Sequence, residues 1–396
     1  MVPPPSPMNL SLQHSELADL HGKVAAGTRL SEPDALRLFE TRDLHALGAL
    51  ADLANQRRNG RRATYLLNRY LNYSNYCILS CQFCAFARKK RDADGFELTI
   101  EQMVAKAKEA LALGITELHI VGGLHPSLPF GYYLDMLRAL REVGPLLQLK
   151  CFTAIEILHL AWLARQTVRD TLLALREAGL DALTGGGAEI FAPAVRSRIA
   201  RGKESAEEWA DVHRTWHQLG GRSTCTMLYG HVESAADRVD HLRRLRELQD
   251  ETRGFVGFVP LPYQPENNGL PVTKPPTGFD TLRTLAASRL YLDNFDHITA
   301  YWVGLGMKLA QVALSYGADD LHGTILEEHI FRMAGGAAGQ HQTEAAMVRA
   351  IREAGRIPAQ RNTFYEPIRF WEGDVPPGPP GLSTQAGILE ANLATA

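Results

Sequence analysis

Short apolar runs alternate with amphipathic segments along most of the chain. Eight of these runs have the length and the apolar, β-branched or aromatic content of buried strands. They cover residues 64–73, 116–121, 149–154, 181–186, 222–229, 254–261, 297–303 and 318–323. Segments with helical periodicity follow nearly all of these runs, and this alternation favours a parallel sheet. Eight such units favour an α/β fold with a closed, TIM-like (β/α)8 barrel. An open doubly wound sheet is the alternative, because periodicity alone does not prove closure.

Local signals mark the ends of several predicted helices. Residue pairs with the spacing of a capping box precede three apolar-periodic segments: Thr99 with Gln102, Ser205 with Glu208, and Ser234 with Asp237. Glycines stand where other helices are expected to end, each immediately before a new strand: Gly114, Gly179 and Gly220.

The pattern divides the chain into four parts. Residues 63–368 hold the barrel units, and residues 31–62 favour an N-terminal helical extension packed outside the barrel. The two ends of the chain are rich in proline, serine, glycine or alanine, so we expect short flexible tails over residues 1–30 and 369–396.

Composition limits the class of protein, the partners and the cellular compartment that the sequence allows. The 396 residues are 45% apolar, enough for a large core, and the net charge of −2 has no basic excess to suggest a nucleic-acid partner. No apolar run reaches the roughly 18–20 residues of a membrane helix, and the N-terminus lacks the pattern of a secretory signal. Five cysteines, three of them clustered, do not suit a disulfide framework. We therefore expect a cytoplasmic protein without membrane insertion and without a nucleic-acid partner.

The clustered cysteines form the spacing C-x3-C-x2-C. Cys77, Cys81 and Cys84 follow the first predicted strand, at the end of a barrel where enzymes place their chemistry. A structural zinc site needs a fourth ligand, and no nearby motif supplies one. Cys151 and Cys225 stand alone in strand-like segments and are expected to be buried apolar thiols. A cubane iron–sulfur cluster has four ligand positions, so three cysteines leave one iron open to another molecule.

This motif, with Phe83 before the last cysteine, resembles the radical S-adenosylmethionine (SAM) enzymes. The resemblance implies one [4Fe–4S] cluster per chain, held by the three cysteines, with SAM on the fourth iron through its amino and carboxylate groups. It also implies reductive cleavage of SAM to methionine and a 5′-deoxyadenosyl radical. Phe83 is then expected to pack against the cluster or the adenine, with ordinary loop packing as the alternative.

Four further residues match SAM-binding elements of that family. Gly122 and Gly123, in "IVGGLHP" after the second strand, are expected to receive the SAM ammonium, since a residue without Cβ permits close approach. Glu189, in "GGGAEIF", is expected to bind ribose hydroxyls. Lys203 is the predicted cation for the SAM carboxylate, although Arg198 and Arg201 are near it and a surface role is the alternative.

The segment "MLYGHVES" after the fifth strand resembles the G-x-x-E element that the family places near the adenine. The resemblance assigns Gly230 and Glu233 to SAM binding.

Longer segments closely resemble the aminofutalosine synthase family from about residue 35 to 368. They include "HIVGGLHPSLPFGYYLDMLR", "FTAIEI", "GLDALTGGGAEIFAP" and "YWVGLGMKLAQVALSYGADDLHGT". The family transfers the 5′-deoxyadenosyl radical to the enol ether of 3-[(1-carboxyvinyl)oxy]benzoate, and rearrangement with decarboxylation gives 6-amino-6-deoxyfutalosine for menaquinone biosynthesis. SAM is then a co-substrate, and an external one-electron donor such as flavodoxin or ferredoxin is needed. Thr184 departs from the family, where proline is expected.

Catalytic candidates follow three strands. Glu156 in "FTAIEI" is a candidate base or anchor, and His125 and His231 follow the second and fifth strands. A satisfied structural polar group is the alternative for each. Further candidates for binding the substrate carboxylates are Tyr263, Asn267, Arg289 and Lys308. The long proline-rich loop 262–278 is a predicted lid.

Two classes of alternative function stay open. Cyclic dehypoxanthine futalosine synthase and deazaflavin (FO) synthase-like enzymes share the cluster motif and the barrel, although "GLHPSLPF" with "FTAIEI" favours the aminofutalosine synthases. The other class is a non-catalytic iron–sulfur or zinc-binding module, which would need less architecture than eight barrel units.

Overall fold

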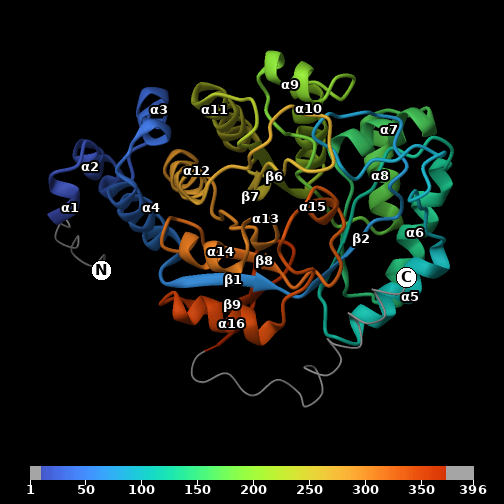
Figure 1. Ribbon diagram of the computed structural model, residues 1–396. Coiled ribbons are helices and arrows are strands. Elements are labelled where there is room, and N and C mark those ends of the chain that lie inside the picture. The colour runs from blue at the N-terminus through green and yellow to red at the C-terminus, as the bar shows by residue number, and fades with distance from the viewer. Residues whose placement is uncertain (1–9, 372–396) are drawn as a thin grey trace.

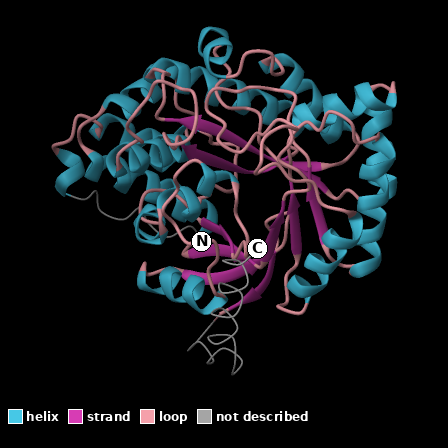
Figure 2. Ribbon diagram, turned by 45° about the vertical axis from the view of Figure 1, so that its right-hand side comes forward, coloured by secondary structure: helices cyan, strands magenta, loops and turns pink. Residues whose placement is uncertain are grey.

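Parallel strands ring the centre of the molecule, and helices cover their outer side (Figures 1 and 2). The computed structural model describes residues 10–371. Six parallel strands pair in chain order: β2 (Asn68–Leu71), β3 (Glu117–Ile120), β4 (Gln148–Cys151), β5 (Ala182–Leu183), β6 (Arg222–Tyr229) and β7 (Phe255–Pro262). A second sheet has the order β10 (Pro367–Phe370), β9 (Ile357–Arg361), β1 (Arg62–Leu66) and β8 (Asp320–Gly323).

The two sheets join into one closed barrel. The predicted first strand, residues 64–73, is split at Leu67 into β1 and β2, so it belongs to both sheets. The predicted seventh strand, residues 297–303, is reduced to two parallel bridges, Phe258–Ile298 and Thr299–Asp320, which connect β7 to β8. β8 then pairs with β1 and completes the ring. The prediction of a TIM-like barrel is confirmed.

Two strands beyond the barrel escaped the sequence pattern. β9 runs parallel to β1, and β10 turns back along β9. The buried positions of β9 include Pro358, Gln360 and Arg361, which are not strand formers. The Arg361 guanidinium is buried there because Asp320 of β8 supplies its counter-ion.

The helices outside the barrel begin where the capping signals predict. α5 (Ile100–Leu111), α10 (Ala206–Gln218) and α11 (Ala235–Thr252) each open with the predicted capping box. α8 (Val168–Ala178) ends at Gly179, as predicted. The other helices of the barrel region are α6 (Phe130–Val143), α7 (Ala154–Ala164), α9 (Pro193–Ile199), α12 (Gly278–Tyr291), α13 (Trp302–Leu305), α14 (Met307–Ala313), α15 (Ile330–Met333) and α16 (Glu344–Glu353).

The N-terminal region is more ordered than a tail. α3 (Glu32–Glu40) and α4 (Leu44–Asn59) lie within the segment predicted as a helical extension. The tail prediction for residues 1–30 is wrong for its described part, where α1 (Leu10–Gln13) and α2 (Ala18–Ala26) form and α2 packs on α4. Leu17 and Leu20 are buried there, and this short apolar stripe escaped the sequence pattern. Residues 1–9 and most of the predicted C-terminal tail, 372–396, lie outside the described residues.

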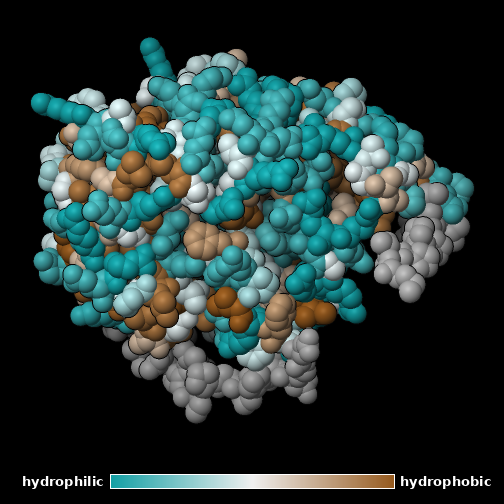
Figure 3. All heavy atoms as spheres, turned by 180° about the vertical axis from the view of Figure 1, so that it is seen from behind, coloured by the Kyte–Doolittle hydropathy of each residue, from teal (hydrophilic) through white to brown (hydrophobic). Residues whose placement is uncertain are grey.

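The face opposite to that of Figure 1 is mainly hydrophilic with scattered apolar patches (Figure 3). Within residues 10–371, no helix combines the length and the apolar content needed to cross a membrane.

A buried ion pair links the strands at the closure of the ring. The carboxylate of Asp320 (β8) accepts hydrogen bonds from Nε and an Nη of Arg361 (β9), at 2.6 and 3.0 Å. It also accepts from the hydroxyls of Thr64 (β1) and Thr299, at 2.7 and 2.9 Å. Burial opposes the charge of Asp320, but Arg361 outweighs burial and holds the pKa of that carboxyl well below its usual range.

Replacement of Asp320 by asparagine is expected to destabilise the barrel strongly. Loss of the charge leaves Arg361 buried without its anion, which costs about 3–5 kcal/mol. Denaturant unfolding of Asp320→Asn measures the change. The control is Asp135→Asn, since Asp135 forms an exposed pair with Arg138 that contributes about 1 kcal/mol or less. Equal losses in the two variants would contradict the assigned role.

Candidate active site

A cavity of about 310 Å³ lies at the C-terminal ends of the barrel strands. The loops after β2, β3 and β5 form much of its wall, together with inward-facing residues of β6 and β7 and the segment after β8. It is lined by most of the residues that the sequence predicted for the site: Cys77, Cys81, Phe83, Cys84, Gly122, Gly123, Glu156, Glu189 and Lys203. The tertiary structure therefore brings together residues that span more than a hundred positions of the chain.

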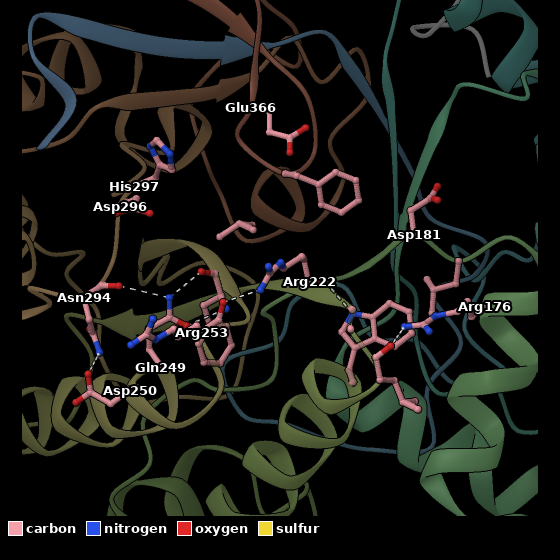
Figure 4. Close-up of a pocket in the computed structure, with 18 residues that line it drawn as sticks. Arg176, Asp181, Arg222, Gln249, Asp250, Arg253, Asn294, Asp296, His297 and Glu366 are labelled. Atoms are coloured by element: carbon pink, nitrogen blue, oxygen red, sulfur yellow. Dashed lines mark hydrogen bonds between the residues drawn. The ribbon is translucent and has the colours of Figure 1, made fainter.

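A second hollow, of about 900 Å³, opens at the other end of the barrel (Figure 4). Its walls come from the residues that precede β5, β6 and β7. The polar groups there bond to their neighbours: Arg222 donates to the carbonyl of Arg253 at 2.7 Å, and Asn294 donates to Asp250 at 2.7 Å. This is the face where barrel residues serve stability rather than chemistry.

The cysteine loop is held in place by backbone hydrogen bonds. The Cys77 amide donates to the carbonyl of Arg88, and the Ile78 amide donates to the carbonyl of Leu124 after β3. The ammonium of Lys89 donates to the carbonyls of Cys77, Ile78 and Leu79, at 2.9, 3.2 and 2.8 Å. The sequence pattern gave no sign of this contact between Lys89 and the cysteine backbone, which only the folded loop shows.

The glycine pair packs directly against the cysteine loop. The Gly123 amide donates to the carbonyl of Ser74 at 2.9 Å. A Cβ at Gly123 would lie 2.3 Å from the carbonyl oxygen of Tyr76 and 3.0 Å from the Cβ of Cys77. A Cβ at Gly122 would lie 2.5 Å from the ring of Tyr73. Both positions therefore require glycine for packing, before any ligand is considered.

A second pair faces the cavity beside Phe83. Lys203 and Glu189 form a buried ion pair with an N–O distance of 2.5 Å, and the Lys203 ammonium lies 5.6 Å from the centre of the Phe83 ring. Burial opposes the charge on Lys203, but Glu189 outweighs it and raises the pKa of the ammonium. Glu189 has a φ of 43°, a strained conformation that is commonest at functional sites. Of the three candidate cations, only Lys203 lines the cavity; Arg198 and Arg201 do not.

The comparisons with known proteins agree with this geometry. Residues 71–245 match the radical SAM superfamily model, and residues 252–372 match the model of the CofH/MqnC C-terminal region. The chain is 46% identical to the aminodeoxyfutalosine synthase of Thermus thermophilus over 91% of this chain and 98% of that protein. It is 43% identical to the aminodeoxyfutalosine synthase of Streptomyces coelicolor, over 90% of this chain and 95% of that protein. The chain belongs to the radical SAM superfamily.

Two more distant relatives extend the comparison. The cyclic dehypoxanthine futalosine synthase of Streptomyces coelicolor is 38% identical, over 89% of each chain. Among solved structures, methylornithine synthase has a TM-score of 0.68 with 18% identity, and the match covers 86% of this chain and 97% of that one. At that identity the structural match shows the radical SAM barrel fold alone.

Radical SAM enzymes use a [4Fe–4S] cluster and SAM, and the chemistry of the cysteine loop fits a cluster. All three thiols line one cavity. Within the described residues, no three His, Cys, Asp or Glu side chains are grouped closely enough to hold a single metal ion. Burial raises the pKa of Cys81 to about 12 and also raises that of Cys84. Thiolates at these positions need nearby positive charge, which iron supplies.

The Glu156 carboxylate accepts four hydrogen bonds from the protein beside the glycine pair. Its Oε1 accepts hydrogen bonds from the Tyr73 hydroxyl at 2.7 Å and the Gly122 amide at 3.0 Å. Its Oε2 accepts from the amide and hydroxyl of Thr153, both at 2.7 Å. Burial raises the pKa of the Glu156 carboxyl, and these donors oppose that rise. With four protein donors bound, the carboxylate positions Gly122, and of the two roles predicted for Glu156 the geometry favours the anchor over the base.

Neither predicted catalytic histidine lines the cavity. His125 Nδ1 accepts from the amides of Ser127 and Leu128, and its Nε2 lies 2.7 Å from Glu97. His231 Nδ1 accepts from the amide of Val232, and its Nε2 lies 3.0 Å from the carbonyl of Leu228. Both rings make hydrogen bonds with their loops, so the geometry favours a structural role and gives the catalytic assignment no support.

The G-x-x-E segment is likewise turned away from the cavity. Glu233 accepts from the Gly230 amide at 2.5 Å and from Arg238 Nε at 2.9 Å, and its side chain is fully buried. A Cβ at Gly230 would meet the ring of Pro276 at 2.6 Å. These residues shape the loop after β6, and β6 itself presents Thr224, Thr226 and Leu228 to the cavity. The expected contact of Gly230 and Glu233 with SAM gains no support.

Among the four residues proposed for the substrate carboxylates, only Tyr263 lines the cavity. Arg289 instead forms a buried pair with Asp319 at 2.5 Å. Sequence reasoning missed a group of polar residues on the cavity floor: Tyr70, His119, Lys150, Tyr301 and His322. The alternation of β3 and β4 would have placed His119 and Lys150 on the inner face of the barrel.

Arg196 was also missed. Its guanidinium donates to the carbonyls of Glu204, Ala188 and Gly187, at 2.6, 2.7 and 3.0 Å. These bonds hold the loop that carries Glu189. The Glu204 carboxylate, in contrast, has no hydrogen-bond partner within the described chain, and burial raises its pKa to about 7.

Replacement of Gly123 by alanine is expected to displace the cysteine loop. The new Cβ would collide with the Tyr76 carbonyl, which is backbone and cannot rotate away. Iron content after anaerobic reconstitution should therefore fall several-fold, together with SAM binding. Gly131→Ala in α6 is the matched control, because a Cβ there has no neighbour within 4 Å. Normal iron content in Gly123→Ala would show that the loop tolerates the shift.

Proposed function

We propose that this chain is an aminodeoxyfutalosine synthase of the futalosine route to menaquinone. The observation that carries the proposal is its identity of 46% and 43% to two such enzymes over at least 90% of this chain and 95% of each of theirs. The cyclic dehypoxanthine futalosine synthase of Streptomyces coelicolor is less similar, at 38%, and is the alternative.

Cys77, Cys81 and Cys84 would hold the cluster in this proposal. Their loop is the one part of the described cavity wall with three thiols. Cys151 and Cys225 are fully buried within β4 and β6, and burial raises the pKa of both thiols far above the usual range. They are therefore packing residues.

The remaining residues of the mouth would bind SAM. The carbonyls and amides around Gly122 and Gly123 can approach a ligand ammonium closely, because neither residue has a Cβ. The Lys203–Glu189 pair offers a cation for a carboxylate and an anion for hydroxyl donors, beside the Phe83 ring. When bound and reduced, the cluster supplies one electron that cleaves SAM to methionine and a 5′-deoxyadenosyl radical.

The protein then has to hold the enol ether of 3-[(1-carboxyvinyl)oxy]benzoate against the adenosyl C5′. Radical addition requires the two carbons to be near contact, about 3–3.5 Å apart, before the radical forms. The loop between β7 and α12 assists closure over the site. Tyr263 and Gln264 of this loop line the cavity, and the Gly269 amide donates to the carbonyl of Gln82, between Cys81 and Phe83, at 2.7 Å.

The enzyme also needs an external one-electron donor of the flavodoxin or ferredoxin type, and we place the enzyme in the cytoplasm. Both statements are parts of the proposal.

SAM labelled at the 5′ carbon tests the reaction. Incubation with the enol ether and a reductant should place the label in the nucleoside product, because the adenosyl carbon becomes bonded to substrate carbon. Mass spectrometry of the products gives the answer. The sister cyclase reaction abstracts hydrogen, so release of 5′-deoxyadenosine as the sole labelled product would defeat the proposal.

Single cysteine variants test the ligand set. Cys77→Ala, Cys81→Ala and Cys84→Ala should each lose the cluster and all activity, because a three-thiolate site has no spare ligand. Cys225→Ala is the control and should keep both, at a cost in stability of about 1 kcal/mol for the small cavity. Iron analysis and visible absorbance measure loading. An active Cys81→Ala variant would overturn the assignment.

A further inference from the structure

The floor of the cavity carries a lysine that forms no ion pair within 4 Å in the described residues. Lys150 of β4 is the register partner of His119 of β3, and both line the cavity below the level of the glycine pair. The Lys150 side chain is 3% exposed. Its ammonium has no hydrogen-bond partner and no ion pair within 4 Å in residues 10–371.

A buried ammonium is normally paired, because its removal from water is costly. The other lysine of the cavity, Lys203, obeys this rule through Glu189. Lys150 does not. Glu117 lies in the same part of the barrel, but its oxygens accept hydrogen bonds from Asn68 and Thr363, at 3.1 and 2.8 Å.

The other carboxylates of the cavity wall are also occupied. Glu156 accepts four hydrogen bonds from Tyr73, Gly122 and Thr153. Glu328 accepts from the backbone amides of Phe331 and Arg332. Within residues 10–371, no carboxylate oxygen lies within 4 Å of the Lys150 ammonium, and Glu117 acts on it only at longer range. The space beside Lys150 in the cavity can therefore hold an anionic ligand.

The surroundings of Lys150 suit an aromatic ligand. The ring of Tyr70 stacks on His119 with 4.3 Å between centroids, and its hydroxyl lies 3.3 Å from His322 Nε2. Tyr301 packs edge-on against His322 and against Phe331, at 5.1 and 5.4 Å. All of these residues line the cavity. A cation set among aromatic rings matches the charge and shape of a benzoate.

We propose that Lys150 is the binding residue for the ring carboxylate of the substrate, so that the benzoate end lies on the barrel floor and the enol ether points toward Gly122 and Glu189. The identity of the substrate rests on the proposed function, whereas the carboxylate site rests on Lys150 itself. Because the benzoate would be fixed at the floor, the distance from its carboxylate to its enol ether would decide which substrates reach the adenosyl carbon.

Lys150→Met tests this site, since methionine has a similar length and no charge. The KM for the dianionic substrate should rise about 10- to 100-fold, the weight of a charge-assisted hydrogen bond, with SAM binding and iron content unchanged. Inhibition by 3-methoxybenzoate, which has only the ring carboxylate, should weaken by a similar factor. Inhibition by 2-phenoxyacrylate, which has only the enol carboxylate, should not change. Equal losses for the two inhibitors, or an unchanged KM, would overturn the proposal.

The unfolding temperature of the variant distinguishes a ligand-binding role of Lys150 from a structural role. Loss of an unpaired buried charge should leave the unfolding temperature of ligand-free Lys150→Met unchanged or raise it. Lys108→Met, at an exposed position of α5, is the control for loss of a lysine. A large fall in Lys150→Met alone would mean that Lys150 serves folding.

The wild-type protein gives an answer even if the variant fails to fold. 3-Methoxybenzoate should raise its unfolding temperature, and the neutral isostere 3-methoxybenzamide should not. Equal shifts with the two compounds would overturn the carboxylate site. If the benzoate stabilises the protein but the enol ether is not converted, the Lys150 site stands and the proposed function falls.

Discussion

The architecture depends on one buried carboxylate at the closure of the ring. Asp320 bonds to side chains from β1, from the reduced seventh strand and from β9, in addition to the backbone of its own strand. The seventh strand has only two bridges to its neighbours, so backbone pairing alone closes the barrel weakly there. Side-chain hydrogen bonds to a charge are stronger than neutral ones and fill that gap. The hydrogen bonds of Asp320 keep the barrel closed, and the closed barrel fixes the loops that form the site at its C-terminal end.

The interior of the barrel is then layered by charge. Asp320 and Arg361 form a lower layer in which the two charges pair within the protein. Lys150 lies in the next layer, where Glu117 acts on it electrostatically but no carboxylate of the described residues comes within 4 Å. Above it, the cavity meets the glycine pair, the Lys203–Glu189 pair and the cysteine loop.

The contrast between Glu156 and the two histidines shows that the sequence does not predict in which direction a loop side chain points. All three follow strands at the correct end of the barrel, which made them equal candidates. Glu156 faces the cavity wall and holds Gly122, whereas His125 and His231 turn back into their own loops. Position after a strand predicts the end of the barrel on which a residue lies, but a loop can direct its side chain inward or outward. Gly123 shows the same limit, since its nearest neighbour is the Tyr76 backbone.

The sequence by itself determined the barrel, the cysteine loop and the family. Strand–helix alternation has few stable closures, and a three-cysteine motif is local, so both can be read along the chain. Only the tertiary structure decided that Lys89 holds the cysteine backbone, that β9 joins β1 beside the barrel, and that no described carboxylate comes within 4 Å of Lys150. Contacts of the barrel interior join residues far apart in sequence: Arg361 lies 41 residues from Asp320, and Glu117 lies 246 from Thr363. Charge pairing is decided by distance in space, which periodicity and local motifs do not encode.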